Sequence, residues 1–435
     1  MNRIVLNVFI TMIMIISIYA EDFSRSLESI NAESNNSTIE EEIQQPITVQ
    51  SVRSILSGYD PLEHTTGQIR AGYINFSEDG IANTTAYALA GHFHFNTQRW
   101  NGLMVGAEAY TVFNLGNQQN NTRLNNDFFD LNGKSFILLS EAYLDGKWGN
   151  TEIKLGRQSI DTPHADNDDI RMIPNYFEVY GITNTDVDNV TLSAGLIHRM
   201  AGWEKRVDSS KFVHVGETLG VDQKIDGIYY AAATYEGIKD LSLSLWYYNY
   251  NDIANVIYAE AGYSYQLSKS ISLILGLQYD GSQETGAEIL GKQDAQTYGI
   301  SVETNFVEIG VTVLGAYNQD NGDTGGMGLS LGGGPFFTSM EDQTLDVMET
   351  SGSAWIIGAG YDFGKLGIDN LTFGVAYGSF KADDSSLYES REIDTVLEYN
   401  FNDKITTYAA YAIVDFKVNG MKDYDQFRVI ANYNF

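Results

Sequence analysis

The chain has 435 residues and a formal net charge of −31, from 57 acidic and 26 basic side chains. Nucleic acid is excluded as a partner because its phosphate backbone would be repelled, whereas a cationic or neutral solute or a divalent ion is a natural counterpart. The absence of cysteine excludes a disulfide framework and fits passage through an oxidising compartment. With 5 Pro and 42 Gly, the composition favours many strands and tight turns over long helices.

The first residues predict a secretory signal. Arg3 gives a basic start, Ile4 to Ile16 form an almost unbroken apolar run, and Ser17 to Ala20 offer a cleavage site before Glu21. We therefore expect residues 1–20 to be a signal peptide and the protein to be exported. Beyond it, no apolar stretch approaches the roughly 20 residues that a spanning helix needs. Only a closed β-barrel crosses a bilayer with such a sequence, because the lumen-facing half of each strand stays polar.

Residues 21–66 form a separate acidic segment. The triplet Glu40 to Glu42 and the polar cluster Asn35 to Thr38 predict a flexible periplasmic lead-in. A short docking helix or partial plug at residues 51–56 is the alternative.

Residues 67–435 predict an all-β fold, a transmembrane antiparallel β-barrel of about 18 strands. Amphipathic segments of about the 9–11 residues that a tilted spanning strand needs recur along this region, and their even number is typical of single-chain bacterial barrels. The connections are alternately short and longer, which places both chain ends on the periplasmic side. The segments are 67–75, 85–95, 101–113, 134–146, 149–157, 175–182, 189–198, 224–235, 238–249, 255–266, 270–281, 293–304, 305–319, 352–364, 369–380, 389–401, 404–416 and 424–435.

The last segment has a polar and an apolar face. Gln426, Arg428, Asn432 and Asn434 share one face, and the apolar face ends on Phe435. It resembles the closing strand of bacterial outer-membrane barrels, whose terminal aromatic residue is read by the assembly machinery. We therefore expect a location in the bacterial outer membrane. The partners that this implies are the lipid bilayer, lipopolysaccharide and, through Phe435, the barrel-assembly machinery. A homo-trimer is compatible with the sequence but not specified by it.

Strand alternation also assigns acidic residues to the lumen, because a charge on the lipid face costs a few kcal/mol near the midplane. An acidic lumen concentrates cations and repels anions. For each residue, the alternative is that it only hydrates the wall or pairs with a neighbour. The assigned residues are Glu108, Glu141, Glu260, Glu303, Glu308 and Glu398, with Asp145 and Asp394.

His92 and His94 share the lumen face of one segment. An i, i+2 histidine pair can hold a transition metal, but the sequence assigns no third ligand. The alternative is a pair of polar wall residues, and neither a metal nor another cofactor is predicted.

The most distinctive internal motif lies at residues 155–174. A strand ends in a Gly-x-Gln turn at Gly156, meets Pro163, and is followed by an Asp-x-Arg-x-x-Pro step from Asp169 to Pro174. This stretch resembles the third-loop region of the OprD-type porins, a family of eighteen-stranded, substrate-specific outer-membrane channels. The resemblance is close over the motif and extends loosely over the barrel.

The resemblance implies that the third loop folds inward and narrows the pore. By position, Asp166, Asp168, Asp169 and Arg171 would line the constriction. Candidates for the family's ladder of basic residues are Arg70, Lys154, Arg157 and Arg428. This chain is poor in arginine and crowded with carboxylates, which departs from a family that usually carries carboxylate-bearing substrates. For the loop cluster, the alternative is a solvated external turn.

The resulting functional hypothesis is a porin for passive diffusion of small hydrophilic solutes, either cation-preferring or substrate-selective through an acidic constriction. The alternatives are a barrel enzyme and a structural or adhesive barrel with a plugged lumen. None of the six histidines lies in a recognisable nucleophile motif, and a narrow eight-stranded barrel would suffice for adhesion. The glycine runs at 325–328 and 332–334 lack the context of a phosphate loop and predict a flexible external loop.

Overall fold

The computed structural model describes residues 62–116, 123–204, 207–325 and 329–435. The predicted signal peptide and residues 21–61 of the predicted acidic segment lie outside this range. The first strand, β1 (Leu62–Glu78), begins earlier than the expected residue 67.

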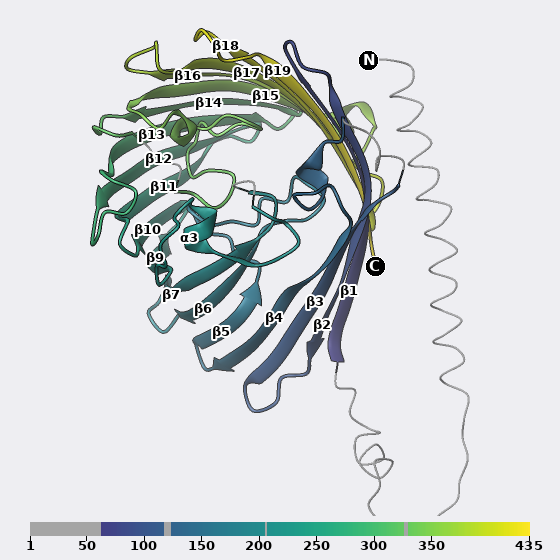
Figure 1. Cartoon of the computed structure of the whole chain (residues 1–435), viewed down its shortest axis with the longest axis vertical. Helices are drawn as coiled ribbons and strands as arrows, with labels where there is room; N and C mark the ends of the chain where they lie inside the picture. Colours follow the sequence, from purple (N-terminus) through teal and green to yellow (C-terminus); the bar gives the residue numbers. More distant parts are fainter. Residues whose placement is uncertain (1–61, 117–122, 205–206, 326–328) are drawn as a thin grey trace, which may run out of the picture.

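Eighteen strands of the described chain form a closed antiparallel barrel (Figure 1). Each pairs with its neighbours along the chain, and the last strand, β19 (Tyr424–Asn434), pairs with β1 and closes the wall. The other wall strands are β2 (Thr84–Thr97), β3 (Leu103–Asn114), β4 (Phe136–Trp148), β5 (Thr151–Gln158), β6 (Tyr176–Asn184), β7 (Val190–Ala201), β9 (Ile228–Ile238), β10 (Leu241–Tyr250), β11 (Ala254–Ser268), β12 (Ile271–Glu284), β13 (Asp294–Phe306), β14 (Val311–Asp320), β15 (Gly352–Asp362), β16 (Leu371–Ala382), β17 (Glu389–Asn400) and β18 (Ile405–Phe416).

The remaining elements of the described chain are short and lie in the connections. The two-residue strand β8 (Val213–His214) pairs with the end of β7 and leads into α3 (Val215–Thr218). Three 3₁₀-helices complete the set: η1 (Asn126–Phe128), η3 (Leu345–Met348) and η4 (Phe363–Leu366). No helix in the described part of the chain has the length and apolar character needed to span a membrane.

The predicted barrel and its eighteen strands are confirmed, with one consequential shift of a boundary. The segment expected at 305–319 begins only at Val311, because residues 307–310 form a turn that ends at Gly310 with a φ of 68°. Glu308 therefore lies in a turn and not on the wall. The prediction that Glu308 faces the lumen was wrong.

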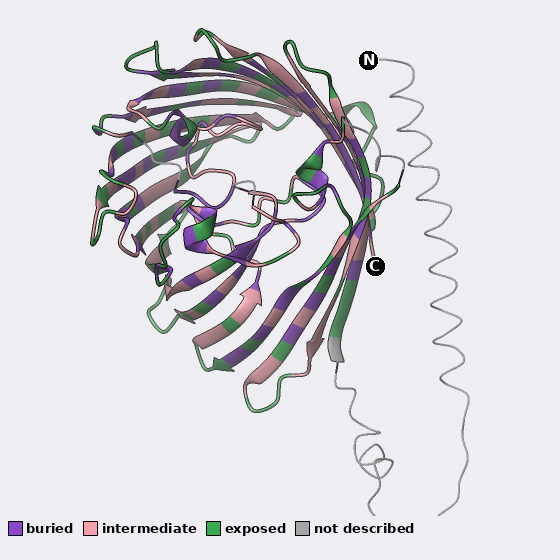
Figure 2. Cartoon of the chain, in the orientation of Figure 1, coloured by how far each residue is buried: buried purple, intermediate pink, exposed green. Residues whose placement is uncertain are grey.

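The two faces of the wall are distinct. On β17, Ser390, Glu392 and Asp394 are buried, whereas Ile393 and Leu397 are exposed on the opposite face. The same alternation gives the banding along the strands in Figure 2. Polar side chains inside and apolar side chains outside are the pattern that a bilayer selects in a barrel.

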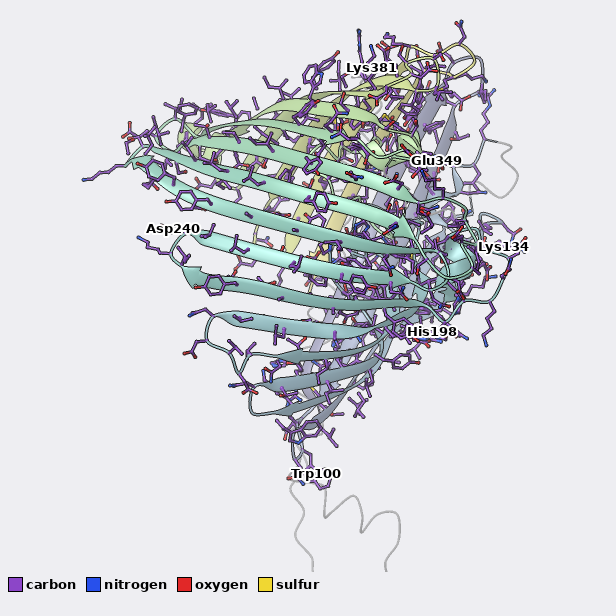
Figure 3. All side chains as sticks on the ribbon, turned by 90° about the vertical axis from the view of Figure 1, so that its left-hand side faces the viewer. Trp100, Lys134, His198, Asp240, Glu349 and Lys381 are labelled. Atoms are coloured by element: carbon purple, nitrogen blue, oxygen red, sulfur yellow. The ribbon has the colours of Figure 1, made fainter. Side chains whose placement is uncertain are left out.

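The connections differ at the two ends of the barrel. Asp240 lies in a short turn at one end, and Lys134 and Glu349 lie in long connections at the other (Figure 3). Three long connections matter for the site. We name them L3 (residues 159–175), L4 (residues 202–227, described apart from 205–206) and L7 (residues 321–351, described apart from 326–328).

The hydrophobic core lies inside the barrel, between these loops and the wall. Ala165 of L3, Val215 at the start of α3 and Leu331 of L7 pack with Tyr248 and Val256 of the wall in one cluster. Burying each large apolar side chain stabilises the fold by about 1.5–3 kcal/mol. L3, predicted to fold inward, does so. L7 also folds inward, so the prediction of a flexible external loop was wrong at the glycine run 332–334. Residues 326–328 of the other run lie outside the described residues.

Candidate pore constriction

An ion pair fixes L3 to the first wall strand. Arg70 on β1 is 2% exposed and donates from Nη1 and Nη2 to the two carboxylate oxygens of Asp169, at 2.5 and 2.7 Å. Nη1 also donates to the backbone carbonyl of Arg171 at 2.8 Å. The wall makes room for the loop nearby, since a Cβ on Gly72 would lie 2.3 Å from Sδ of Met172. A bidentate pair of this kind sets both the position and the orientation of the loop.

L3 and L7 pair with each other across the lumen. Ala165 and Leu331 form a parallel β-bridge, in which the Leu331 N–H donates to the His164 carbonyl at 2.8 Å. The N–H of Gly333 donates to Asp166 at 3.4 Å. The other side of this pair reaches the wall through His164, whose Nε2 lies 2.6 Å from a carboxylate oxygen of Asp280 on β12. The two loops therefore form one connected structure inside the barrel.

L7 is held in turn by the strands near the C-terminus. The Glu392 carboxylate accepts the backbone N–H groups of Asp342 and Gln343, each at 2.9 Å. Asp394 accepts the N–H of Glu341 at 3.0 Å. The Glu341 side chain forms an ion pair with Arg428 on β19, which is 2% exposed. Acidic wall residues thus serve as acceptors for the loop backbone.

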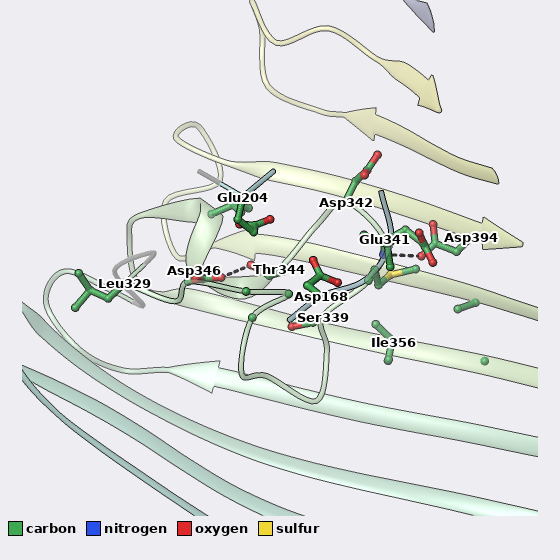
Figure 4. A pocket seen from close by; sticks show the side chains of 18 of the residues that line it. Asp168, Glu204, Leu329, Ser339, Glu341, Asp342, Thr344, Asp346, Ile356 and Asp394 are labelled. Atoms are coloured by element: carbon green, nitrogen blue, oxygen red, sulfur yellow. Dashed lines mark hydrogen bonds between the residues drawn. The ribbon is translucent and has the colours of Figure 1, made fainter. Parts of the chain in front are cut away.

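A cavity of about 1450 Å³ lies between the loops and the wall (Figure 4). Its lining includes nine carboxylates and two basic side chains, Arg171 and Lys292. Lys292 is paired with Asp323 at 2.5 Å, and the Arg171 guanidinium lies 4.4 Å from the ring of Trp203. The carboxylates are Asp168, Glu204, Glu303, Asp323, Glu341, Asp342, Asp346, Glu349 and Asp394.

The four residues predicted to line the constriction divide into two roles. Asp168 and Arg171 line the cavity. Asp166 and Asp169 instead hold the loop, the first to L7 and the second to β1. The sequence motif therefore located the loop correctly without separating its anchors from its lining.

Asp168 occupies an unusual backbone position. Its φ is 32°, in the left-handed region that residues other than glycine rarely adopt. Its carbonyl accepts hydrogen bonds from Nε1 of Trp203 at 3.1 Å and from the N–H of Ile170 at 2.9 Å. Burial, together with the charges of Glu204 and Asp166, raises the pKa of Asp168 to about 7.

The residues of the predicted basic ladder either contact other side chains in the lumen or face away from it. Arg70 and Arg428 face inward, and each is paired with a loop carboxylate. The Lys154 ammonium lies 3.9 Å from the centre of the Tyr143 ring. Arg157 and Leu155 are two residues apart on β5 and therefore lie on the same face of the wall. Leu155 pairs with Leu144 of β4, and Arg157 pairs with Ala142. Because Leu144 and Leu155 are exposed, this is the outer face. The assignment of Arg157 to the lumen was wrong. It was based on the position of Arg157 in the family motif, whereas strand alternation decides which face of the wall a residue occupies.

Most predicted acidic wall residues do face inward. Glu303 lines the cavity. Glu260 and Glu398 share strand faces with the buried residues Tyr258 and Asp394 respectively. Glu108 and Glu141 are 6% and 8% exposed and lie beside His94. The structure thus supplies neighbours for the histidine pair that the sequence could not assign.

The sequence reasoning missed the L7 residues Glu341, Asp342 and Asp346. A signal was available on the wall, where Ala354 and Ala382 occupy lumen positions that a water-filled barrel would make polar. Small apolar side chains there indicate that another part of the chain packs onto them. In the structure this cover includes Phe336, Leu345 and Met348 of L7.

Comparisons with known proteins agree with this architecture. The family described as outer membrane porin, OprD family, matches residues 102–435. A search of curated proteins found no match. Among solved structures, Pseudomonas aeruginosa OccK8 (OprE) is similar with 19% identity and a TM-score of 0.70, covering 85% of this chain and 97% of that chain. Pseudomonas aeruginosa OpdK with vanillate has 18% identity, a TM-score of 0.70 and coverage of 86% and 99%. Acinetobacter baumannii OccAB3 has 14% identity, a TM-score of 0.71 and coverage of 85% and 99%.

Proposed function

The chain belongs to the OprD family of outer-membrane porins, and from this premise we propose that it is a cation-preferring channel for passive diffusion of small hydrophilic solutes. The family and the barrel indicate the bacterial outer membrane. They also favour a channel over the alternative of a barrel enzyme. The cation preference is our own inference from the charges around the cavity.

The observation that carries the proposal is the excess of carboxylates in the cavity. Nine carboxylates face two basic side chains there, and Lys292 is already paired with Asp323. Arg70 and Arg428 also face inward, and each forms an ion pair with a loop carboxylate. Low-dielectric walls strengthen the field of such a cluster and raise the local concentration of counter-ions. The pore therefore attracts cations and the positive ends of zwitterions.

The same charges argue against organic anions as the preferred solutes. Pseudomonas aeruginosa OpdK has been crystallised with vanillate, which carries a carboxylate. In this chain a solute carboxylate would approach Asp168, Glu341 and Asp342 within one cavity. The carboxylates of the cavity would repel a solute carboxylate, because like charges repel. We therefore propose cationic, zwitterionic or neutral solutes instead.

A planar-bilayer measurement tests the proposal. Purified full-length protein is inserted into a bilayer with a KCl gradient, and the reversal potential is read. We expect the sign that corresponds to K⁺ permeating better than Cl⁻. A preference for Cl⁻ would overturn the proposed selectivity, and an absence of conductance would favour the plugged structural barrel.

A matched pair of variants locates the selectivity. Asp168→Asn removes a charge from the cavity lining, and Asp240→Asn removes one from the short turn at the opposite end of the barrel. We expect the first to shift the reversal potential towards zero and the second to leave it nearly unchanged. The lipopolysaccharide leaflet, the assembly machinery and a homo-trimer stay predictions from the sequence.

A further inference from the structure

Three potential metal ligands converge on the lumen wall at β2, β3 and β4, with ligand atoms that all lie within 4.8 Å of one another. His94 pairs with Glu108 across β2 and β3, and Glu108 pairs with Glu141 across β3 and β4. These three residues form an in-register row on one face of the wall. His92 lies on the same face of β2, two residues before His94. Three rigid strands therefore hold the row, which is how a preorganised site is built.

A β-bulge in β4 directs the acidic side chains. The register shifts between Glu108 and Ala109, so that both Ser140 and Glu141 lie opposite this point of β3. Ser140 and Glu141 are consecutive residues and are both buried. A bulge places two successive side chains where regular alternation would place one, and bulges of this kind re-aim side chains near functional sites.

Each carboxylate has one oxygen occupied and one directed at the histidines. Oε1 of Glu108 accepts hydrogen bonds from the Tyr176 hydroxyl at 2.6 Å and the Ser140 hydroxyl at 2.8 Å. Oε1 of Glu141 accepts the backbone N–H of Ser159 at 3.0 Å. The two Oε2 atoms are the ones that approach the imidazole rings. Hydrogen bonds to the far oxygen of a carboxylate orient metal ligands in this manner.

The shortest contacts between the inward atoms are close to the spacing of ligands around a tetrahedral metal. Nδ1 of His94 lies 3.0 Å from Oε2 of Glu141 and 3.9 Å from Oε2 of Glu108, and Nδ1 of His92 lies 3.3 Å from the same Glu108 oxygen. Ligand atoms about 2.0–2.1 Å from a tetrahedral Zn²⁺ are about 3.3 Å apart. The observed spacings bracket that value.

The hydrogen bond of the His94 imidazole leaves its Nδ1 available. Nε2 of His94 lies 2.8 Å from Oδ1 of Asn96, an oxygen that also accepts the Tyr143 hydroxyl at 3.0 Å. Nε2 therefore donates its hydrogen, and Nδ1 of the neutral ring presents a lone pair to the carboxylates. Nδ1 of His92 is buried and has no hydrogen-bond partner among the described residues. The nitrogen lone pair of His94 beside two carboxylate oxygens forms a donor set suited to a cation.

We propose that His94, Glu108 and Glu141 form a binding site for a divalent transition-metal ion of the Zn²⁺ type, with His92 beside it on the same face of β2. Imidazole nitrogen with carboxylate oxygen favours such ions over Ca²⁺ or Mg²⁺, which take oxygen ligands. The site touches both ends of L3, because Ser159 begins that loop and Tyr176 follows it. A bound ion would thereby stiffen the attachment of the constriction loop to the wall.

Calorimetric titration of the full-length protein with Zn²⁺ tests the proposal. The protein is purified in detergent, stripped with a chelator and titrated in the presence of excess Ca²⁺, which occupies the weak carboxylate sites of this acidic chain. We expect one Ca²⁺-resistant site per chain. Titration with Co²⁺ gives a second readout, because nitrogen and oxygen ligands in a tetrahedral arrangement produce a visible absorption band.

Three variants separate this site from the rest of the protein. His94→Gln and Glu141→Gln keep the side-chain size and are expected to weaken Zn²⁺ binding at least about tenfold and to abolish the Co²⁺ band. His64→Gln changes an exposed histidine at the start of the barrel and is expected to change neither. Each variant is first shown to be folded by its heat-modifiable migration in gels.

Two results would overturn the proposal. One is the lack of any Ca²⁺-resistant Zn²⁺ site in the wild-type protein. The other is equal Zn²⁺ affinity in the wild type and both folded glutamine variants, which would mean diffuse binding to surface carboxylates. Neither result depends on the ion selectivity of the channel.

Discussion

At the scale of single residues, Asp168 is the most informative part of the constriction. It combines a φ of 32° with burial in a cavity that also contains Glu204 and Arg171. Strain and an unfavourable location for a charge are tolerated where the surrounding structure holds a residue for function. Nε1 of Trp203 donates a hydrogen bond to the carbonyl of Asp168, and the Arg171 guanidinium lies over the ring of the same tryptophan. These contacts fix the backbone of Asp168, which lines the cavity.

This position predicts pH-dependent selectivity. Because burial raises the pKa of Asp168 to about 7, the group is neutral below that pH and negative above it. We expect the preference for K⁺ over Cl⁻ to rise between about pH 6 and about pH 8. A charge about 8 Å from an ion contributes about 0.5 kcal/mol in water and about 2 kcal/mol at an effective dielectric constant of 20. The rise should therefore be at least about twofold.

Reversal potentials measured across this pH range check the prediction. In Asp168→Asn the rise should be much smaller, whereas Asp240→Asn, altered in a turn outside the cavity, should behave as the wild type. The same pH profile in Asp168→Asn and in the wild type would assign the titration to another group.

At the scale of elements, L7 determines how the arginines of the lumen act. Arg428 is buried on β19, and its neighbouring carboxylate comes from Glu341 of L7. The Tyr408 hydroxyl also donates to Glu341, and Asp394 holds the Glu341 backbone. A wall arginine with such a partner contributes little net field to the pore. By folding inward, L7 thus brings Glu341 to Arg428 and neutralises its positive charge.

This arrangement predicts that Glu341→Gln has a larger effect than removal of another charge in the same cavity. The substitution leaves the Arg428 charge without its carboxylate and weakens the attachment of L7 by about 1.5–3 kcal/mol, the usual contribution of a hydrogen bond to a charged group. We expect a lower cation preference and noisier single-channel currents.

Glu349→Gln is the matched control, since Glu349 lines the same cavity and the structure shows no ion pair between it and Arg428. It should reduce the cation preference without adding current noise. Equal noise in the two variants would contradict an anchoring role for Glu341.

At the scale of the whole molecule, closure depends on the two ends of the barrel. The N–H and carbonyl of Phe435 exchange hydrogen bonds with Gly67 at 3.0 and 2.9 Å. A Cβ at Gly67 would lie 2.4 Å from the Phe435 ring, so the terminal aromatic ring packs where only a glycine leaves space. Closing the sheet removes the unpaired edges that a bilayer does not tolerate.

We expect Phe435→Ala to separate assembly from stability. The backbone bonds to Gly67 remain in this variant, so refolding of the purified chain into detergent should proceed nearly as in the wild type. In cells, loss of the aromatic end should lower the amount of heat-modifiable barrel in the outer membrane several-fold. Equal losses in both assays would show that the ring mainly stabilises closure and would count against recognition by the assembly machinery.

The sequence alone determined the wall of this protein. Period-two alternation is a local property of an extended chain, and it located eighteen strands because lipid and lumen select opposite side chains at successive positions. Short turns join neighbours, so the order of strands followed as well. Two assignments were wrong: alternation was applied to Glu308 on a strand that begins only at Val311, and Arg157 was assigned from a family motif.

Only the tertiary structure decided what fills the lumen. Arg70 meets Asp169 across 99 positions of sequence, and Arg428 meets Glu341 across 87. No local pattern encodes such partners, because they depend on where the loops turn back and on the space that small wall residues leave. The row of His94, Glu108 and Glu141 is explained only by the sequence and the tertiary structure together. Alternation turned these side chains inward, but the register and the bulge of β4 brought their ligand atoms together.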